Sequence, residues 1–149
     1  MSQENLEIVQ RFFKAVERAL QTRRGAMLDA ATAGDIPPDA AEAFGYMHPE
    51  AEWNPAFSGE TYRGLLGLAK GWDELLEAAE SYSLELLDVS ELGDDRVLAV
   101  FGPSLQGKSS GIQVNAAIFA VVTLEDSLIT HLDEYTSLRE ALAAAGLSE

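Results

Sequence analysis

The sequence predicts an α+β domain in which helices cover one face of a largely antiparallel sheet. Two observations favour this class. Apolar residues recur with helical spacing through the first half of the chain, whereas the second half consists of extended apolar stretches separated by short turns. The 149 residues are 47% apolar, which is enough for one hydrophobic core, and the sequence contains no internal repeat or low-complexity linker. We therefore expect one domain that spans residues 1–149.

The first predicted helix begins near Ser2, a candidate N-cap, and carries one apolar stripe. The members of this stripe recur at spacings of three and four residues: Leu6, Val9, Phe12, Phe13, Val16 and Leu20. Beyond the stripe, the helix either continues through Met27 toward Gly34 or breaks at Gly25. The sequence leaves both alternatives open.

Prolines mark the start of a second, shorter helix at residues 37–38. We expect this helix to run through Met47 and to stop at His48, because a residue that precedes proline is driven out of the helical region. A third predicted helix follows Gly64. Its apolar side consists of Leu65, Leu68, Ala69, Trp72, Leu75, Leu76 and Ala79.

Four strands are predicted in the second half, at residues 84–92, 97–101, 112–124 and 128–135. Turn-forming residues separate the first two strands and the last two. The loop between Trp53 and Tyr62 is rich in Pro, Gly and Ser, and it predicts a short early hairpin. Residues 138–147 are rich in Ala and predict a terminal helix that ends at Gly146.

Side chains alternate between the two faces of a strand, so each strand predicts an inner and an outer set. In residues 128–135 the predicted inner set is Leu128, Thr130, Leu132 and Glu134. In residues 112–124 the inner set includes the small Ala116 and Ala120, which leave either closer packing against the helices or a pocket. The outer set of that strand mixes polar with large apolar side chains, which predicts a homodimer interface on the outer sheet face.

Charge and composition exclude several classes of partner. The chain has 10 Lys and Arg against 25 Asp and Glu, a formal net charge of −15, which repels nucleic-acid phosphates and anionic lipid. No signal peptide and no apolar run of membrane-spanning length is recognisable. The chain has no cysteine and therefore no disulfide. We expect a cytoplasmic domain that binds neither nucleic acid nor a membrane.

Three motifs in this order resemble SnoaL-like proteins of the nuclear transport factor 2-like superfamily. They are residues 48–53 (HPEAEW), residues 62–64 (YRG) and Glu134-Tyr135 before the terminal helix. The resemblance covers almost the whole chain, apart from a longer stretch around residues 21–36. It implies a cone-shaped domain whose curved sheet is wrapped by helices around a pocket and commonly dimerises through its outer face. Members include polyketide cyclases, ketosteroid isomerases, limonene epoxide hydrolases and proteins without a known substrate.

Site residues of these enzymes match the chain unevenly. Asn54 stands where ketosteroid isomerases have an Asp base, Phe12 falls near their oxyanion-hole Tyr, and Ala120 falls near their protonated Asp, so we do not expect their chemistry. Limonene epoxide hydrolases use an Arg and an Asp on a middle strand, and residues 112–124 offer no counterpart. Glu134 does match their carboxylate on the last strand, and Asn54 resembles their water-positioning Asn.

The resemblance therefore implies that Glu134 is the one acid/base group of the pocket, since alternation points it inward and an apolar site raises the proton affinity of a carboxylate. Trp53, Asn54, Tyr62 and Ala120 are the predicted ligand-binding residues. Structural alternatives exist for each kind of residue. Glu134 could reach solvent or pair with an Arg, Trp53 could be core packing, and Asn54 could cap a turn. No metal or other cofactor is expected.

Three functions remain open at this point. The first is a cyclase- or isomerase-type enzyme that acts through Glu134 on an apolar carbonyl or polyketide-like compound. The second is a non-catalytic ligand-binding or dimeric interaction protein, and the third, weaker alternative is an epoxide hydrolase. In each case a small apolar molecule is the expected ligand of the pocket.

Overall fold

The chain is described by a computed structural model over residues 2–22, 27–56, 58–77, 79–107, 113–114 and 116–147. Its strands form one seven-stranded sheet in the order β2-β1-β7-β6-β4-β3, with β5 beside β4. They are β1 (Met47–Asn54), β2 (Tyr62–Arg63), β3 (Ala79–Glu91), β4 (Arg96–Gly107), β5 (Gln113–Val114), β6 (Ile118–Glu125) and β7 (Leu128–Tyr135). Among the described pairs, only β1 and β7 run parallel. The predicted α+β class with a largely antiparallel sheet is confirmed.

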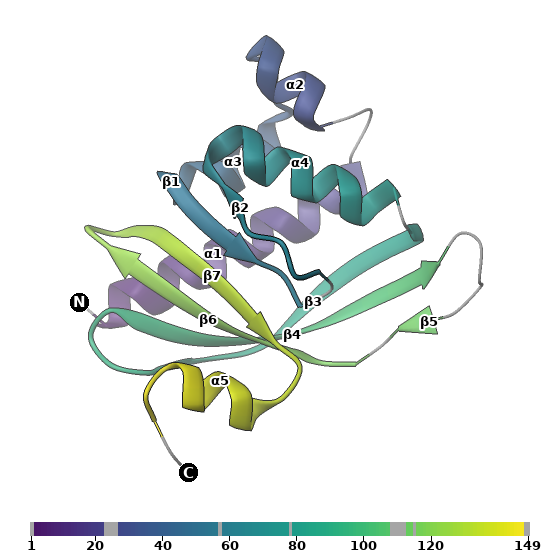
Figure 1. The fold of residues 1–149 in the computed structure, drawn as a ribbon. Helices are drawn as coiled ribbons and strands as arrows, with labels where there is room; N and C mark the ends of the chain where they lie inside the picture. The colour runs from purple at the N-terminus through teal and green to yellow at the C-terminus, as the bar shows by residue number, and fades with distance from the viewer. Residues whose placement is uncertain are drawn as a thin grey trace.

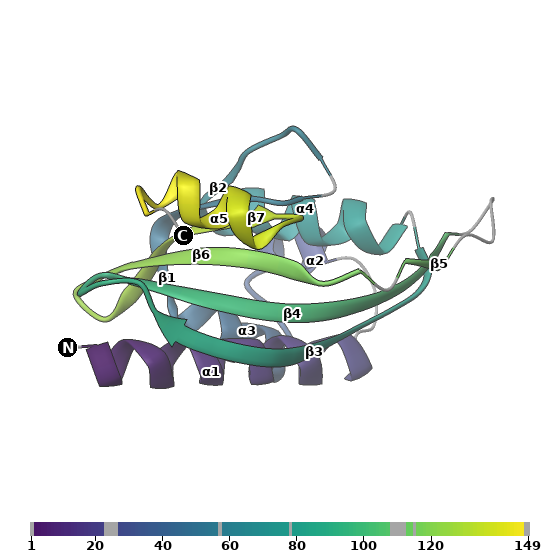
Figure 2. The same cartoon turned by 90° about the horizontal axis from the view of Figure 1, so that it is seen from below.

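Helices lie on both sides of this curved sheet. They are α1 (Ser2–Thr22), α2 (Met27–Ala33), α3 (Pro38–Gly45), α4 (Gly64–Glu77) and α5 (Leu138–Ala144). Figure 1 shows α1, α3 and α4 beside the inner face of the sheet, and Figure 2 shows β3, β4 and β6 curving around α1 with α5 on the opposite side. None of the described helices is long and apolar enough to cross a membrane.

The first predicted helix is described as α1 up to Thr22, and α2 is described from Met27. Residues 23–26, which include the possible break at Gly25, lie outside the described residues. α3 has proline in its first turn, as predicted, but it ends at Gly45. Met47 already belongs to β1, so the predicted extension of the helix through Met47 is wrong. Likewise Ala79 is the first residue of β3 rather than the last of α4.

Two strands are longer than predicted, because β3 and β4 pair along their whole length, from Ala79 opposite Gly107 to Glu91 opposite Val97. Pro103 is tolerated inside β4 because the pairing with β6 ends at Phe101 and the pairing with β5 starts at Leu105. The predicted long strand at residues 112–124 is divided into β5 and β6, and residues 116 and 117 belong to neither. Residues 112 and 115 lie outside the described part.

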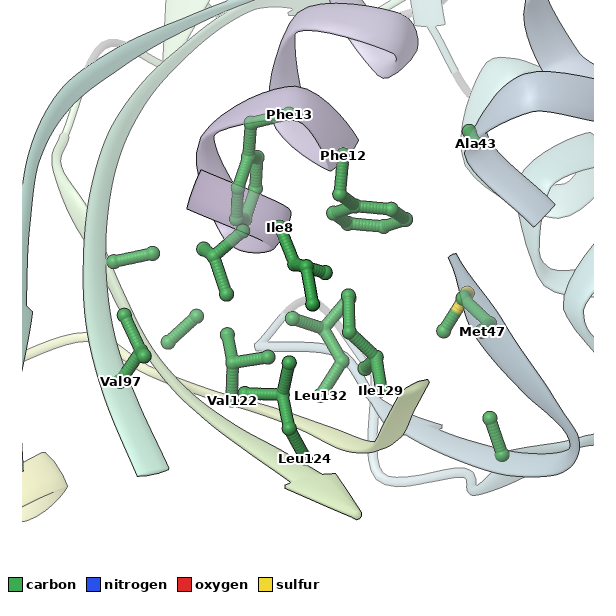
Figure 3. Packing of buried hydrophobic residues seen from close by; sticks show 14 of the residues in the cluster. Ile8, Phe12, Phe13, Ala43, Met47, Val97, Val122, Leu124, Ile129 and Leu132 are labelled. Atoms are coloured by element: carbon green, nitrogen blue, oxygen red, sulfur yellow. The ribbon is translucent and has the colours of Figure 1, made fainter. Parts of the chain in front are cut away.

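The main core lies between α1 and the inner sheet face, where Phe12 and Phe13 pack above Val122, Ile129 and Leu132 (Figure 3). Ile129 is fully buried there, whereas the predicted Leu128 and Thr130 are not part of this cluster. The reason is a bulge: Thr123 pairs with His131 but Leu124 pairs with Ile129, which shifts the alternation by one residue. Beyond the bulge the predicted alternation holds, so Leu132 and Glu134 face inward.

A second cluster lies on the outer face, under α5. Ala141 of this helix and Ala145, which follows its last residue, pack on Leu98 and Val121 of the sheet. Ser137 caps the helix by accepting a hydrogen bond from the backbone N–H of Glu140 at 3.1 Å. The chain itself therefore covers part of the face for which the sequence predicts a homodimer interface, and that interface stays a prediction.

Candidate functional site

The inner sheet face, α1 and α4 enclose a cavity of about 80 Å³. Its wall is almost entirely apolar and aromatic, with Phe12, Phe13, Trp53 and Trp72 among the lining residues. Glu134 is the only charged side chain among the described residues that line it. The cavity therefore combines one ionisable group with a wall that suits an apolar ligand.

Glu134 reaches the cavity from the end of β7, where it lies opposite Ala120 of β6. Its Oε2 accepts a hydrogen bond from Trp53 Nε1 at 2.8 Å, and its Oε1 accepts one from the backbone N–H of Ala56 at 3.0 Å. Burial raises the pKa of Glu134 above its ordinary value of 4.5, and the two donors, which favour the ionised form, oppose this only in part. The structure thus places a fixed carboxyl group with raised proton affinity in an apolar cavity.

Trp53 and Tyr62 form an aromatic pair beside Glu134, with ring centroids 5.5 Å apart. Gly71 of α4 permits this arrangement, since a Cβ there would lie 2.8 Å from Trp53 Cζ3 and 2.9 Å from the Tyr62 ring. Trp53 lines the cavity as predicted. Tyr62, predicted as a ligand-binding residue, does not line the described cavity. It is 4% exposed and packs against the Trp53 ring, while its hydroxyl donates to Glu74. This hydrogen bond, followed by burial, raises the pKa of Tyr62 to about 12.

Asn54 does not line the described cavity. It follows Trp53 on β1, so its side chain lies on the opposite sheet face, where its Nδ2 donates to Asp133 Oδ1 at 2.6 Å. Its Oδ1 accepts a hydrogen bond from the Thr61 hydroxyl. Asn54 therefore links β1 to β7 and to the loop before β2 through hydrogen bonds.

Ala120 is adjacent to the site without lining the described cavity. It is fully buried in the main core and lies opposite Glu134 in the β6–β7 ladder. The sequence left closer packing and a pocket as alternatives for small side chains on this face. At Ala120 the structure shows closer packing.

Two further residues that carry a polar group, Tyr82 and Trp72, line the cavity. Neither was predicted from the sequence as a site residue. Tyr82 lies on β3, and burial, together with the negative charge of Glu134, raises the pKa of its hydroxyl, which stays protonated. It shares the inner parity of Leu84 and Leu86, but it precedes the predicted start of the strand. Trp72 was predicted as part of the apolar side of α4, and its indole Nε1 is buried without a hydrogen-bond partner among the described residues.

The described residues do not bring together the side chains that a metal site or an epoxide hydrolase would need. No three His, Cys, Asp or Glu side chains of the described residues form a metal-binding group. Arg63 of β2 is an exposed side chain that pairs with Glu52 at 2.7 Å and does not line the described cavity. Nothing in the described lining therefore supplies the arginine of an epoxide hydrolase.

Solved structures share the fold of this chain. An NTF2-like protein from Burkholderia xenovorans LB400 is 22% identical, with 97% of each chain covered and a TM-score of 0.61. A proposed SnoaL-like polyketide cyclase from Jannaschia sp. CCS1 is 16% identical, with 99% of this chain and 95% of that chain covered and a TM-score of 0.63. The chain has the nuclear transport factor 2-like fold.

A third protein with this NTF2-like fold, TerC, was co-crystallised with polyporic acid. It is 17% identical, with 97% of each chain covered and a TM-score of 0.61. No family model and no curated protein matches the sequence. At these identities the likeness establishes the fold, and the chemistry has to be argued from the site.

Proposed function

We propose that the chain is a cyclase- or isomerase-type enzyme that uses Glu134 as acid and base on a small, largely apolar carbonyl compound. One observation carries the proposal: a single carboxyl group, held by Trp53 and Ala56, projects into an apolar cavity that raises its pKa. A carboxyl group with a raised pKa is better suited than an ordinary one both to removing a proton and to returning it. The occurrence of this fold in proposed polyketide cyclases supports a carbonyl substrate.

The chemistry follows from the geometry of the carboxyl group. Glu134 as carboxylate would take a proton from the carbon next to the carbonyl group, which leaves an enolate. The enolate would then attack a second carbonyl carbon of the same molecule to close a ring, or accept the proton at another carbon. Glu134 returns the proton to the alkoxide oxygen that ring closure leaves, or to the other carbon in an isomerisation. The reaction therefore needs no cofactor. The donors from Trp53 and Ala56 keep the carboxyl group oriented through both transfers.

The size of the cavity restricts the substrate. About 80 Å³ is less than the roughly 150 Å³ of an engineered cavity that holds benzene, and less than the roughly 300–1,000 Å³ of drug-sized sites. The space therefore suits a small ketone, or the reactive end of a longer molecule such as the acetyl group of acetophenone. A non-catalytic binding role is the second candidate, and it is favoured by the few polar groups in the wall.

Hydrogen–deuterium exchange tests the proposal without knowledge of the natural substrate. Simple aryl ketones such as acetophenone would be incubated in D₂O, and deuterium uptake at the carbon next to the carbonyl group would be followed by NMR. We expect wild-type protein to accelerate this exchange and Glu134→Gln to lose at least about 100-fold of the acceleration. Asp133→Asn, a carboxylate change one residue away on the outer face, is the matched control and should retain it.

Two results would contradict the enzymatic proposal. The first is equal exchange by wild type and Glu134→Gln. The second is saturable ketone binding by wild-type protein without any acceleration of exchange, which would favour the binding role.

A further inference from the structure

Trp72 presents a buried donor that the protein itself does not use. Its Nε1 has no hydrogen-bond partner among the described residues, although its ring lines the cavity. Native proteins pair the great majority of buried donors, so an unpaired one calls for an explanation such as a missing partner. Because the Trp72 ring lines the cavity, a molecule bound there can supply the missing partner.

The chain neighbours of Trp72 constrain the part of α4 that carries it. The preceding residue, Gly71, lies against Trp53 and Tyr62, where even a Cβ would not fit. The following residue, Asp73, accepts hydrogen bonds from the backbone N–H groups of Met27 and Leu28 at 2.7 and 2.8 Å. On one side α4 is thus in contact with the aromatic pair, and on the other it caps α2. The unpaired N–H therefore belongs to a constrained part of the helix.

Trp72 also packs against the small cluster that α2 contributes to. Ala19 of α1, Met27 of α2, Ala40 of α3 and Ala69 of α4 form this cluster, and Trp72 packs against it. The ring is thus in contact with this cluster as well as with the cavity. Rotation of the ring to find another acceptor would break contacts on both sides, which leaves the N–H where it is.

The described cavity offers Trp72 few acceptors of its own. Both oxygens of Glu134 already accept hydrogen bonds, from Trp53 and from Ala56. Apart from Glu134 and the Tyr82 hydroxyl, the described wall is made of apolar and indole side chains, with no cation that could balance an anionic ligand. A bound molecule that is neutral and carries an oxygen acceptor meets these conditions.

We infer that the indole N–H of Trp72 binds the carbonyl oxygen of the ligand and selects neutral carbonyl compounds over hydrocarbons of the same shape. This inference rests on the proposed function and adds the residue that recognises the oxygen. In the proton transfer by Glu134, the same N–H would stabilise the negative charge that develops on that oxygen. A hydrocarbon in the same place would leave the donor unpaired, and such sites reject ligands that lack the hydrogen-bonding atom.

The test compares two ligands, acetophenone and cumene, which differ in a carbonyl oxygen against a methyl group. Dissociation constants would be measured for wild type, Trp72→Phe and Leu76→Val, a change that trims the same cavity wall without removing a donor. We expect Trp72→Phe to lower the preference for acetophenone over cumene by about tenfold. Leu76→Val should weaken both ligands and leave the preference unchanged.

The indole resonances give a second readout that a merely structural role would not move. The chain has 2 Trp, so the spectrum of Trp72→Phe assigns both indole N–H signals. Saturation with acetophenone should shift the Trp72 signal downfield, and saturation with cumene should not, because only the ketone accepts a hydrogen bond.

The possible failures can be distinguished. An unchanged preference in Trp72→Phe, or a Trp72 signal that both ligands shift equally, overturns the role of Trp72; a water molecule as its partner would give this result. If neither ligand binds wild-type protein, this inference and the proposed function both fail. If the ketone preference depends on Trp72 but no proton exchange occurs, the inference stands and the enzymatic proposal fails.

Discussion

The two faces of the β1–β7 pair carry two carboxylates with different surroundings. On the outer face, Asp133 accepts a hydrogen bond from Asn54, its partner on β1. On the inner face, the next residue of β7, Glu134, accepts from the side chain of Trp53, which precedes Asn54 on β1, and from the backbone N–H of Ala56. Each carboxylate thus receives a donor from the same strand. Only the inner one also faces an apolar cavity.

This difference shows that hydrogen bonding alone does not make the candidate acid/base group. The donors from Trp53 and Ala56 favour the ionised form of Glu134, but burial under the helices opposes its ionisation and raises its pKa. What distinguishes the inner face is therefore the cover provided by α1 and α4. Substitutions that disturb this cover, remove the charge or remove the donor should therefore have different effects.

The largest expected effect comes from Gly71, which lets α4 approach the inner face. Gly71→Ala would place a methyl group within 2.9 Å of both rings of the aromatic pair, so we expect a loss of about 1–3 kcal/mol in the free energy of unfolding. Gly67→Ala on the same helix is the control, because its nearest contact would be an ordinary 3.5 Å. That variant should be neutral or gain up to about 1 kcal/mol from helix propensity. Denaturant unfolding measures both; equal losses would disprove close packing at Gly71.

The next effect concerns the charge on the inner face and depends on pH. Because the folded protein holds the Glu134 proton more tightly than the unfolded chain, stability from this group is complete at low pH and declines as pH rises from about 4.5 through the folded pKa. Glu134→Gln removes this decline, at about 1.4 kcal/mol for each unit by which the pKa is raised. It also leaves one of the two donors without an acceptor, a cost that does not vary with pH. A difference between variant and wild type that is constant from pH 4 to 8 would contradict the raised pKa.

The smallest effect concerns the donor. Trp53→Phe keeps an aromatic ring and removes the N–H that stabilises the ionised Glu134, so the pKa of Glu134 should rise further. The pH profile of proton exchange should then shift to higher pH. Asn54→Ala, the corresponding change on the outer face, should leave the profile in place. If both variants shift it equally, the two faces are not independent.

The sequence predicted the position of Glu134 correctly although part of the reasoning about β7 was wrong. Alternation assigned Leu128 and Thr130 to the inner face, whereas the bulge opposite Thr123 and Leu124 turns Ile129 inward instead. Glu134 was unaffected because it lies beyond the bulge. A bulge depends on how two strands pair, and the pattern of one strand does not reveal it.

The polar groups of the cavity were only partly predictable for a similar reason. Apolar periodicity placed Trp72 on the inner side of α4, but whether its N–H finds an acceptor depends on residues from other elements. Tyr82 was missed because β3 is extended by its pairing with β4 beyond the segment that looks like a strand on its own. Asn54 was predicted as a ligand-binding residue from its match to a family position. Its neighbour Trp53 faces the cavity, so the side chain of Asn54 lies on the opposite face of the sheet.

The central claim, that the apolar cavity raises the pKa of Glu134, is tested most directly by titrating its carboxyl carbon. Protein labelled with ¹³C at the glutamate carboxyl groups would be followed by NMR from pH 3 to 9, and Glu134→Gln would assign the signal. The account predicts a midpoint clearly above 4.5 for Glu134. A midpoint at or below 4.5 would contradict it.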